Sequence, residues 1–374
     1  MSTTLLRTLH EAAGARLAAL PEAPGSTAPL TYGDVPGEYR AGVEGALLLD
    51  ATTRGSVAVT GGDAADFLHR ITANDVRGLA PGTSNLGLLL TPKGKVQQAF
   101  EVVRTDAGLE LVTAPDAAAE VLAALDSFLF TEDAVLEDRS STRAPIELVG
   151  PEAAAVVRVV LGEALPDVPH TFRDVAFGGA PCRVLSTPVA GSLGLRLDPG
   201  PERVADLWRV LADAGATPGG FFARDSLRIE AGAALFGLDV DANVFPQEAR
   251  LEAAFSLTKG CYTGQEVVAK IDTYGGVNKR LIVLAIEGDD PVARGTRLMR
   301  EQGGEGGEAR DVGLVTSWSY SFALDRGIAL GYAKRKHQAV GTTYRLGADG
   351  PTATSIAFPV REHALAPTGD FEPT

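Results

Sequence analysis

The residues best suited to chemistry in this sequence form an eight-residue run, KGCYTGQE, from Lys259 to Glu266. Thr263 and Glu266 have the S/T-x-x-E spacing of a capping box, so a helix is predicted to begin just after Thr263. Cys261 would then lie close to the positive end of a helix dipole, with the Lys259 ammonium nearby, and both charges favour a thiolate. The run therefore predicts an exposed, reactive thiol at Cys261.

A buried cysteine is the alternative interpretation of this position, because free cysteines usually pack as small apolar residues. We favour the reactive thiol, because Cys261 stands between a glycine and a tyrosine and is flanked by a lysine and a predicted helix start. The candidate catalytic residues are Cys261 and its motif neighbours Lys259, Tyr262, Gln265 and Glu266.

The remaining cysteine and the histidines exclude several kinds of site. Cys182 lies on a predicted strand and is expected to pack in the core. Two cysteines are too few for a disulfide scaffold or for a four-cysteine zinc or iron–sulfur site. The five histidines are scattered, and no H-E-x-x-H motif occurs. We therefore predict no metal site within this chain.

Composition places the chain among globular proteins of two or three domains, with 374 residues of which 45% are hydrophobic. The formal net charge of −14 argues against a broad nucleic-acid or anionic membrane surface. Charged residues interrupt the apolar positions between Leu5 and Leu20, so these residues do not resemble a signal peptide. The expectation is a cytoplasmic protein without a membrane partner.

The predicted elements favour an α+β fold followed by an all-β domain. The apolar residues from Leu5 to Leu20 recur at helical spacing, which predicts an N-terminal helix. Strands predicted at 86–90 and 96–103 form a hairpin around the turn Pro92-Lys93-Gly94. Hairpins of this kind argue against a doubly wound parallel sheet. After residue 277, short β-type runs separated by turns predict a barrel or sandwich.

Three stretches carry a resemblance to known families. The KGCYTGQE run resembles the signature of the YgfZ family, folate-binding proteins that support iron–sulfur proteins. Residues 223–232, ARDSLRIEAG, resemble the R-x-x-L-R-x-E-A-G segment of the glycine cleavage T-protein, an aminomethyltransferase. Residues 67–82 resemble the N-terminal part of the same superfamily.

The resemblance implies a T-protein-like ring of domains around a central folate pocket, ending in a β-barrel. It divides the chain into an N-terminal helix and entry segment (1–34), a folate-binding region of two α+β lobes (35–276), a barrel (277–363) and a tail (364–374). The implied cofactor is tetrahydrofolate or a derivative. No metal is expected to be held by this chain alone.

The main functional expectation is an accessory protein that binds tetrahydrofolate and supports assembly or repair of iron–sulfur enzymes, tRNA-modifying ones among them, through Cys261. Its expected partners are folate and iron–sulfur enzymes or cluster-assembly factors, and direct contact with nucleic acid is not expected. Gln97 and Gln98 stand where the T-protein carries an acidic pair, and a neutral amide cannot hold a proton as a carboxylate does. The sequence therefore leans against an enzyme. The alternatives are a folate-dependent aminomethyl or one-carbon transferase and a non-catalytic module without folate.

Folate contacts are predicted from the chemistry of the cofactor. A pterin edge suits a carboxylate, for which Glu230 is the candidate, and the tail carboxylates suit a cation such as Arg224. Lys95 and Gln97 are the other candidates. Glu230 has an alternative role as an ion-pair partner of Arg228. Additional cations for the anionic end are Lys279 and Arg280.

Overall fold

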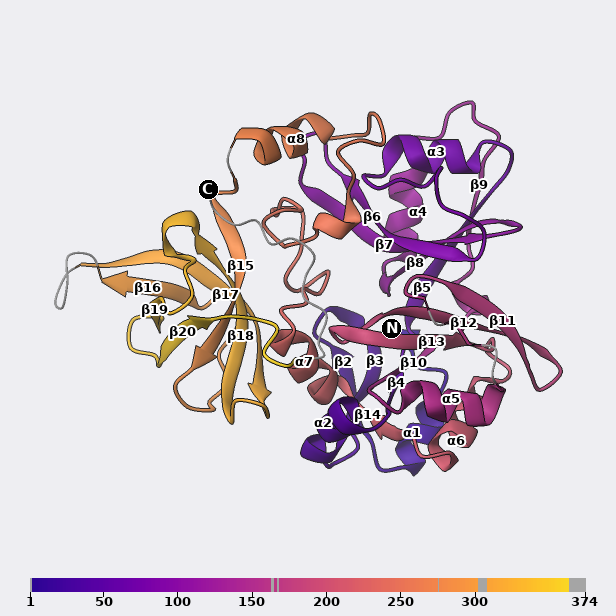
Figure 1. Cartoon of the computed structure of the whole chain (residues 1–374), viewed down its shortest axis with the longest axis horizontal. Coiled ribbons are helices and arrows are strands. Elements are labelled where there is room, and N and C mark those ends of the chain that lie inside the picture. The colour runs from indigo at the N-terminus through magenta and orange to yellow at the C-terminus, as the bar shows by residue number, and fades with distance from the viewer. Residues whose placement is uncertain (1, 163–164, 167, 275, 302–307, 363–374) are drawn as a thin grey trace.

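The computed structural model describes residues 2–162, 165–166, 168–274, 276–301 and 308–362 (Figure 1). His363 and the predicted tail lie outside the described residues. The N-terminal helix is shorter than predicted, because α1 (Arg7–Ala12) is followed by Gly14 with a φ of +77°. The chain then forms a hairpin of β2 (Arg16–Leu20) and β3 (Ala23–Thr31), which β1 (Ser2–Thr3) joins in parallel. Helix α2 (Val35–Glu44) follows.

A five-stranded sheet forms the first large layer, in the order β6-β7-β8-β5-β9. Its hairpin of β6 and β7 confirms the strands predicted around the Pro92-Lys93-Gly94 turn. Helices α3 and α4 contact β8 and bury an apolar face that includes Phe67, Leu68 and Val121. The elements are β5 (Arg54–Thr60), α3 (Ala64–Ile71), β6 (Thr83–Leu90), β7 (Val96–Thr105), β8 (Gly108–Pro115), α4 (Ala118–Asp126) and β9 (Val135–Asp138).

A six-stranded sheet forms the second layer, in the order β11-β12-β13-β10-β4-β14. Helices α5 and α6 cover it, and Trp208 is buried in its core. Cys182 is fully buried there, which confirms its predicted packing role. The elements are β4 (Leu47–Asp50), β10 (Ile146–Val149), α5 (Ala153–Leu161), β11 (Phe172–Phe177), β12 (Ala180–Val189), β13 (Ser192–Asp198), α6 (Val204–Asp213) and β14 (Thr217–Gly219).

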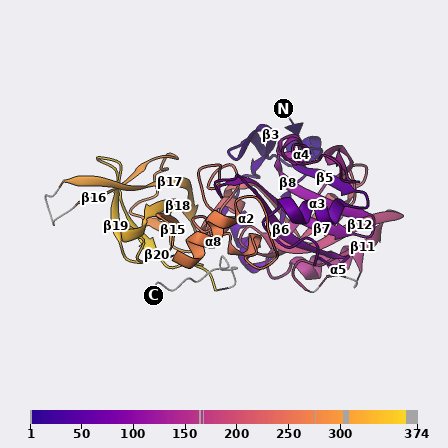
Figure 2. The same cartoon turned by 90° about the horizontal axis from the view of Figure 1, so that it is seen from above.

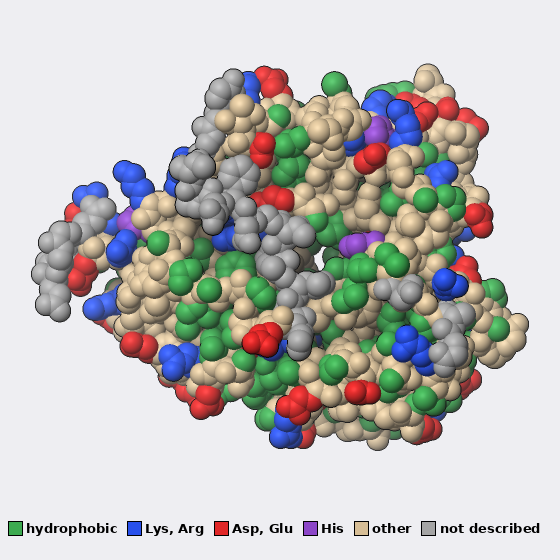
Figure 3. All heavy atoms as spheres, in the orientation of Figure 1, with side chains coloured by type: hydrophobic (Ala, Val, Ile, Leu, Met, Phe, Trp, Pro, Cys, Tyr) green, Lys and Arg blue, Asp and Glu red, His purple; other side chains and the backbone are tan. Residues whose placement is uncertain are grey.

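The C-terminal domain is a closed six-stranded barrel in the order β15-β18-β17-β16-β19-β20, which confirms the predicted fold class. Figures 1 and 2 place the barrel on one side of the molecule and the two large sheets on the other. Helix α7 (Phe221–Glu230) contacts the barrel, and α8 (Gln265–Tyr274) precedes it. The barrel strands are β15 (Lys279–Ile286), β16 (Arg297–Glu301), β17 (Ala309–Ser321), β18 (Arg326–Lys334), β19 (Thr343–Leu346) and β20 (Thr352–Ile356). A narrow opening is visible near the centre of the space-filling view (Figure 3).

A buried ion-pair network joins the two large sheets. Arg196 of β13 donates from Nη1 to Glu101 of β7 at 2.5 Å and from Nε to Glu147 of β10 at 2.9 Å. Arg54 of β5 reaches the same Glu147 oxygen at 3.1 Å. Burial alone would raise the pKa of Glu101, but Arg196 and hydrogen bonds from His170 and Ser84 outweigh burial and lower that pKa to about 2. The network therefore requires ionised Glu101.

Replacing Glu101 with glutamine is expected to lower the free energy of unfolding by about 3–5 kcal/mol, because Arg196 would keep a buried charge with one partner removed. The wild-type advantage should be fully present above pH 4.5 and should disappear as the pH falls toward 2, since the folded pKa lies below the unfolded value of 4.5. Urea denaturation across this pH range measures both effects.

The matched control is Glu137→Gln, because Glu137 forms an exposed ion pair with Arg139 at 2.8 Å. This change should lower the free energy of unfolding by at most about 1 kcal/mol. Equal losses in the two variants would contradict a stabilising role for the network.

No helix among the described residues has the length and apolar content needed to cross a membrane.

Candidate functional site

The KGCYTGQE run lies in a loop that leads directly into α8. The predicted helix is present, since α8 begins at Gln265. Glu266 does not act as a capping-box partner, because its carboxylate pairs with Lys270 one turn further along the helix, with Oε1 2.5 Å from Nζ. Tyr262 and Val268 are buried and anchor the loop and the helix in the core. The loop thus has a fixed position relative to the rest of the chain.

Cys261 is exposed, as predicted, at an open cleft of about 450 Å3 between the loop and α3. Both acidic and basic side chains surround this thiol cleft. They include two ion pairs, Arg70 with Glu132 and Arg77 with Asp66. The lining residues are Asp63, Asp66, Phe67, His69, Arg70, Arg77, Glu132, Lys259, Gly260 and Cys261.

Lys259 ties the thiol loop to the end of α3. Its ammonium donates to the backbone oxygen of His69, and His69 Nε2 donates to the backbone oxygen of Lys259 at 3.1 Å. The ammonium also lies 5.1 Å from the centre of the Tyr262 ring. Burial lowers the pKa of Lys259 to about 8, even though Asp75 opposes the shift. Lys259 therefore loses its charge just above neutral pH.

Two glycines bring the thiol loop against the β6–β7 turn. Gly264 has a φ of +80°, and a Cβ atom there would lie 2.6 Å from the backbone oxygen of Thr91 and 3.0 Å from Gly94 Cα. A Cβ atom on Gly94 would lie 2.9 Å from Val267 Cβ. Contacts this short leave no room for a methyl group, so the two backbones touch only because both residues are glycine.

Gly264→Ala is expected to destabilise the protein more than Gly260→Ala. Both positions have positive φ, which costs alanine about 1–2 kcal/mol. Only position 264 adds a steric clash, since a Cβ atom on Gly260 would meet nothing within 4 Å. Thermal unfolding of the two variants measures the difference, and equal stabilities would contradict the close contact with the turn.

Lys95 on the same hairpin packs against residues 243–248. Its ammonium donates to the backbone oxygen of Asn243 at 3.1 Å, lies 3.7 Å from Glu248 and stands 3.3 Å from the centre of the Phe245 ring. Burial lowers its pKa, and the positive charge of Lys279 lowers it further. The Lys95 ammonium therefore has a backbone acceptor, a carboxylate and an aromatic ring as neighbours.

The two glutamines of the hairpin have different surroundings. Gln97 is exposed, whereas the Gln98 side chain is buried. Gln98 Nε2 lies 3.5 Å from Glu120 Oε2, and its own Oε1 has no hydrogen-bond partner. Glu120 of α4 is thus a carboxylate that reaches the hairpin amide.

The surroundings of Glu230 are those of a residue that holds elements of the fold together, and not those of the predicted pterin ligand. Its carboxylate is fully buried and accepts hydrogen bonds from Tyr39 at 2.7 Å, Arg361 at 2.9 Å and Ser321 at 2.6 Å. These partners join α7 to α2, the barrel and the segment that follows it. The alternative pairing with Arg228 is also absent from the described contacts of Glu230. Among the described residues that line the cleft at Cys261, Glu230 does not occur.

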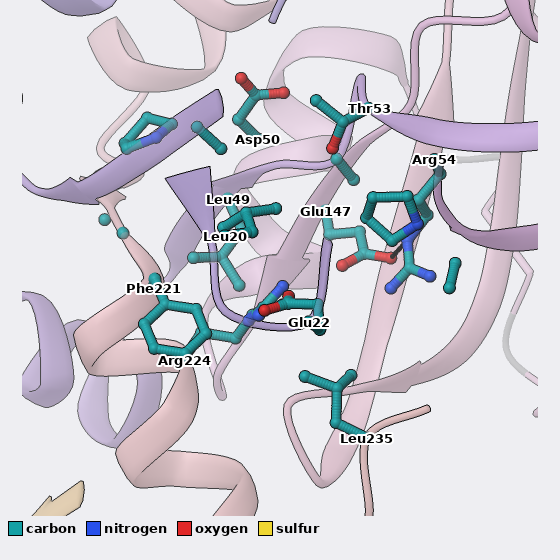
Figure 4. A pocket seen from close by; sticks show the side chains of 17 residues that line it. Leu20, Glu22, Leu49, Asp50, Thr53, Arg54, Glu147, Phe221, Arg224 and Leu235 are labelled. Atoms are coloured by element: carbon teal, nitrogen blue, oxygen red, sulfur yellow. Dashed lines mark hydrogen bonds and ion pairs between the residues drawn. The ribbon is translucent and has the colours of Figure 1, made fainter. Parts of the chain in front are cut away.

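Arg224 lines a small cavity between the β2–β3 turn, β4 and α7 (Figure 4). The cavity volume is about 50 Å3. Its guanidinium pairs with Glu22, and the two side chains point toward one another in Figure 4. Arg224 Nε and Glu22 Oε2 are buried and have no partner among the described residues. Burial would raise the pKa of Glu22, but Arg224 outweighs this effect and the pKa is lowered.

A larger cleft of about 440 Å3 adjoins this cavity and shares Glu22, Ala114 and Pro115 with it. We call it the acidic cleft, because three of its lining side chains are carboxylates. This cleft is not predictable from the sequence, because its residues come from the β2–β3 turn, the end of β8 and α4, which meet only in the folded chain. The lining residues are Glu22, Pro24, Gly25, Ala114, Pro115, Asp116, Ala117, Glu120, Phe236 and Gly237.

Family models match nearly the whole chain. Residues 7–259 match the GCVT N-terminal domain, and residues 279–359 match the glycine cleavage T-protein C-terminal barrel domain. The chain belongs to the glycine cleavage T-protein family. An aminomethyltransferase of Symbiobacterium thermophilum is 31% identical over 357 residues, covering 91% of this chain and 92% of that protein. An aminomethyltransferase of Chlorobium luteolum is 28% identical over 352 residues, covering 91% and 93%.

The solved aminomethyltransferase T of the Bartonella henselae glycine cleavage system has the same fold. Its TM-score is 0.85 at 24% identity, with 98% of this chain and 99% of that chain covered. This likeness supports the T-protein architecture predicted from the sequence.

The relatives correct the main functional prediction. We expected an iron–sulfur accessory protein and leaned against an enzyme, whereas relatives along most of the chain are named aminomethyltransferase. The names of these relatives contradict both expectations. Gln97, Gln98 and the KGCYTGQE run are local features, whereas the similarity to aminomethyltransferases extends along most of the chain.

Among the described residues, no group of three or more His, Cys, Asp or Glu side chains could hold a metal ion.

Proposed function

We propose that this chain is a tetrahydrofolate-dependent enzyme that transfers a one-carbon unit from an aminomethyl group. The observation that carries the proposal is the match to T-protein models and aminomethyltransferases along nearly the entire chain. The shared two-sheet and barrel architecture supports it. The transferase was the alternative function drawn from the sequence.

The side chains present fit folate in two respects. Within the part of the chain that the structure describes, the buried donor Arg224 Nε has no partner, which suits an acceptor on the edge of a pterin ring. Lys95 is a half-buried ammonium group whose pKa is lowered by burial and by the charge of Lys279, and such cations are candidates for the carboxylates of the folate tail. When bound, tetrahydrofolate would supply the nitrogens that accept the carbon unit.

At the β6–β7 hairpin, the protein residues would bind and orient the folate. They would not exchange protons with it. Gln97 and Gln98 carry neutral amides, so each can donate and accept a hydrogen bond without accepting a proton at neutral pH. Arg224 would donate to one edge of the pterin, because the cavity of about 50 Å3 that it lines cannot enclose the whole ring system. Its pairing with Glu22 fixes the guanidinium plane. Proton transfer would then depend on carboxylates outside the hairpin.

Tetrahydrofolate is expected to bind the wild-type protein, and an aminomethyl donor should then yield methylenetetrahydrofolate and ammonia. Arg224→Lys should weaken folate binding about tenfold or more, because it keeps a charge beside Glu22 but loses the guanidinium Nε donor. Calorimetry measures binding, and chromatography of the folates measures transfer.

Arg209→Lys is the matched control, since Arg209 pairs with Asp206 on an exposed face of α6. This change should leave folate binding unaltered. A wild-type protein that neither binds tetrahydrofolate nor forms methylenetetrahydrofolate would overturn the proposed function.

We further propose that, within the T-protein family, the KGCYTGQE run places this chain near the YgfZ proteins and marks a separate thiol site. The exposure of Cys261 in the thiol cleft supports this placement. The contrast with Cys182 also supports it, because burial raises the pKa of the Cys182 thiol to about 12.

Iodoacetamide is expected to modify Cys261 and to leave Cys182 unmodified in the folded protein. Lys259→Met should slow the reaction below pH 8 by less than about tenfold, because a positive charge that lines the same cleft as the thiol is lost. Above a pH of about 8, the difference in labelling rate between Lys259→Met and the wild-type protein should shrink, since wild-type Lys259 is then neutral.

Mass spectrometry of the labelled peptides follows both cysteines. Lys270→Met is the control, because Lys270 lies on exposed α8 and pairs with Glu266. A native Cys261 that reacts no faster than Cys182 would contradict the thiol site.

A further inference from the structure

Basic side chains gather at one end of the C-terminal barrel, although the chain as a whole has a formal net charge of −14. Lys and Arg side chains are visible on the side of the barrel that carries β16 (Figures 1 and 3). We call the group the basic cluster; its members come from β16, β17, the end of β18, the turn that follows β18, and β19. They are Arg300, Arg310, Lys334, Lys336, His337 and Arg345.

The strand register of the barrel places like charges directly opposite each other. Arg300 of β16 is opposite Arg310 of β17, and both side chains are exposed. Lys334 of β18 is likewise opposite Lys279 of β15. Like charges at directly opposite positions destabilise a sheet. The barrel therefore carries a local excess of positive charge that weakens its own strand pairing.

The imidazole of His337 reports this excess of positive charge. Arg300 Nη1 lies 3.0 Å from His337 Nδ1, and because a guanidinium can only donate, Nδ1 accepts this hydrogen bond. Burial lowers the pKa of His337, and the positive charges of Arg300, Lys334 and Lys336 lower it further. Within the described ranges, no carboxylate forms an ion pair with Arg300, Lys336 or Arg345.

Two cations of the basic cluster line an open cleft, which we call the barrel cleft. Arg300 and Arg345 come from the neighbouring strands β16 and β19. Thr343 and Thr352 add two hydroxyl groups, and Glu301 adds a carboxylate. Guanidinium and hydroxyl donors suit the oxygens of phosphate or carboxylate groups. The cleft volume of about 430 Å3 lies within the range of small-molecule sites, which is roughly 300–1,000 Å3.

The charge of the whole chain favours a compact anion over an extended one. The chain has 48 acidic residues against 34 Lys and Arg residues, so the excess of positive charge is local to the basic cluster. A nucleic acid longer than the cluster would meet repulsion from the acidic protein around it. A small anion with several charges would gain the attraction of the cluster without this repulsion.

We infer that the barrel cleft binds a small anion with two or more phosphate or carboxylate groups, which Arg300 and Arg345 hold directly. Arg310, Lys334 and Lys336 strengthen the positive potential around the bound anion. The site goes beyond the proposed folate-dependent transfer, because the described residues that line the barrel cleft and those that line the cavity at Arg224 do not overlap.

Sodium tripolyphosphate and citrate are the two probes, and calorimetry with the full chain at low ionic strength measures their binding. At least one probe should bind, and the tighter one shows whether phosphate or carboxylate groups are preferred. Arg300→Met and Arg345→Met should each weaken binding about fivefold or more, because each removes a guanidinium that lines the cleft. Arg209→Met is the control on an exposed face of α6 and should leave binding unchanged.

NMR titration of His337 gives a second readout, which a loss of folding would not reproduce. A bound anion should raise the pKa of His337, because it opposes the positive charges that lower this pKa. In the absence of a probe, Arg300→Met should also raise the pKa of His337, since one of those charges is removed.

Failure of both probes to bind, or unchanged binding in either arginine variant, would overturn the inference. Displacement of a bound probe by tetrahydrofolate would also overturn it, since the barrel cleft would then belong to the folate site. An RNA of about 20 nucleotides that binds more tightly than tripolyphosphate would do the same, because the basic cluster would then serve an extended polyanion. Probe binding that persists in a protein without folate-dependent transfer would remove the proposed function and support the separate anion site.

Discussion

The ion pairs between the five-stranded and six-stranded sheets fix the relative position of the two sheets, on which the cavity at Arg224 depends. Glu101 and Arg54 come from one sheet, whereas Arg196 and Glu147 come from the other, so the charges alternate across the interface. Burying the charges of Glu101, Glu147 and Arg196 is favourable only when each has well-placed partners, and this requirement specifies one relative position of the sheets. The cavity at Arg224 includes Arg54 and Glu147 in its wall, so the network also shapes the candidate folate region.

The acidic cleft and the thiol cleft differ in their chemistry and lie in different parts of the fold. The acidic cleft is built from the N-terminal hairpin, the end of β8 and α4, whereas the thiol cleft is built from α3 and the loop before α8. The β6–β7 hairpin reaches both regions, since Gln98 contacts Glu120 and Gly94 contacts the thiol loop. A single hairpin thus connects the acidic cleft physically with the thiol loop.

Local patterns in the sequence predicted the barrel, the β6–β7 hairpin and the start of α8, because period-two apolar alternation and turn residues determine such elements over short distances. The predicted N-terminal helix is too long, because the apolar spacing continues through Leu20 whereas the helix in the structure ends before Gly14. The exposure of Cys261 was predictable from adjacent residues. The surroundings of Glu230 were not, because Tyr39, Ser321 and Arg361 approach it only in the folded chain. The acidic cleft was missed for the same reason.

The contact between Gly94 and Gly264 also limits how this protein can change over evolution. A side chain at position 264 would meet the backbone oxygen of Thr91 and the Cα atom of Gly94, not the end of a flexible side chain. No smaller neighbouring residue could relieve that overlap, so second-site suppressors at adjacent side chains should be rare. Descendants that lose glycine at position 264 would have to move the whole turn, and the position of the thiol loop would change with it.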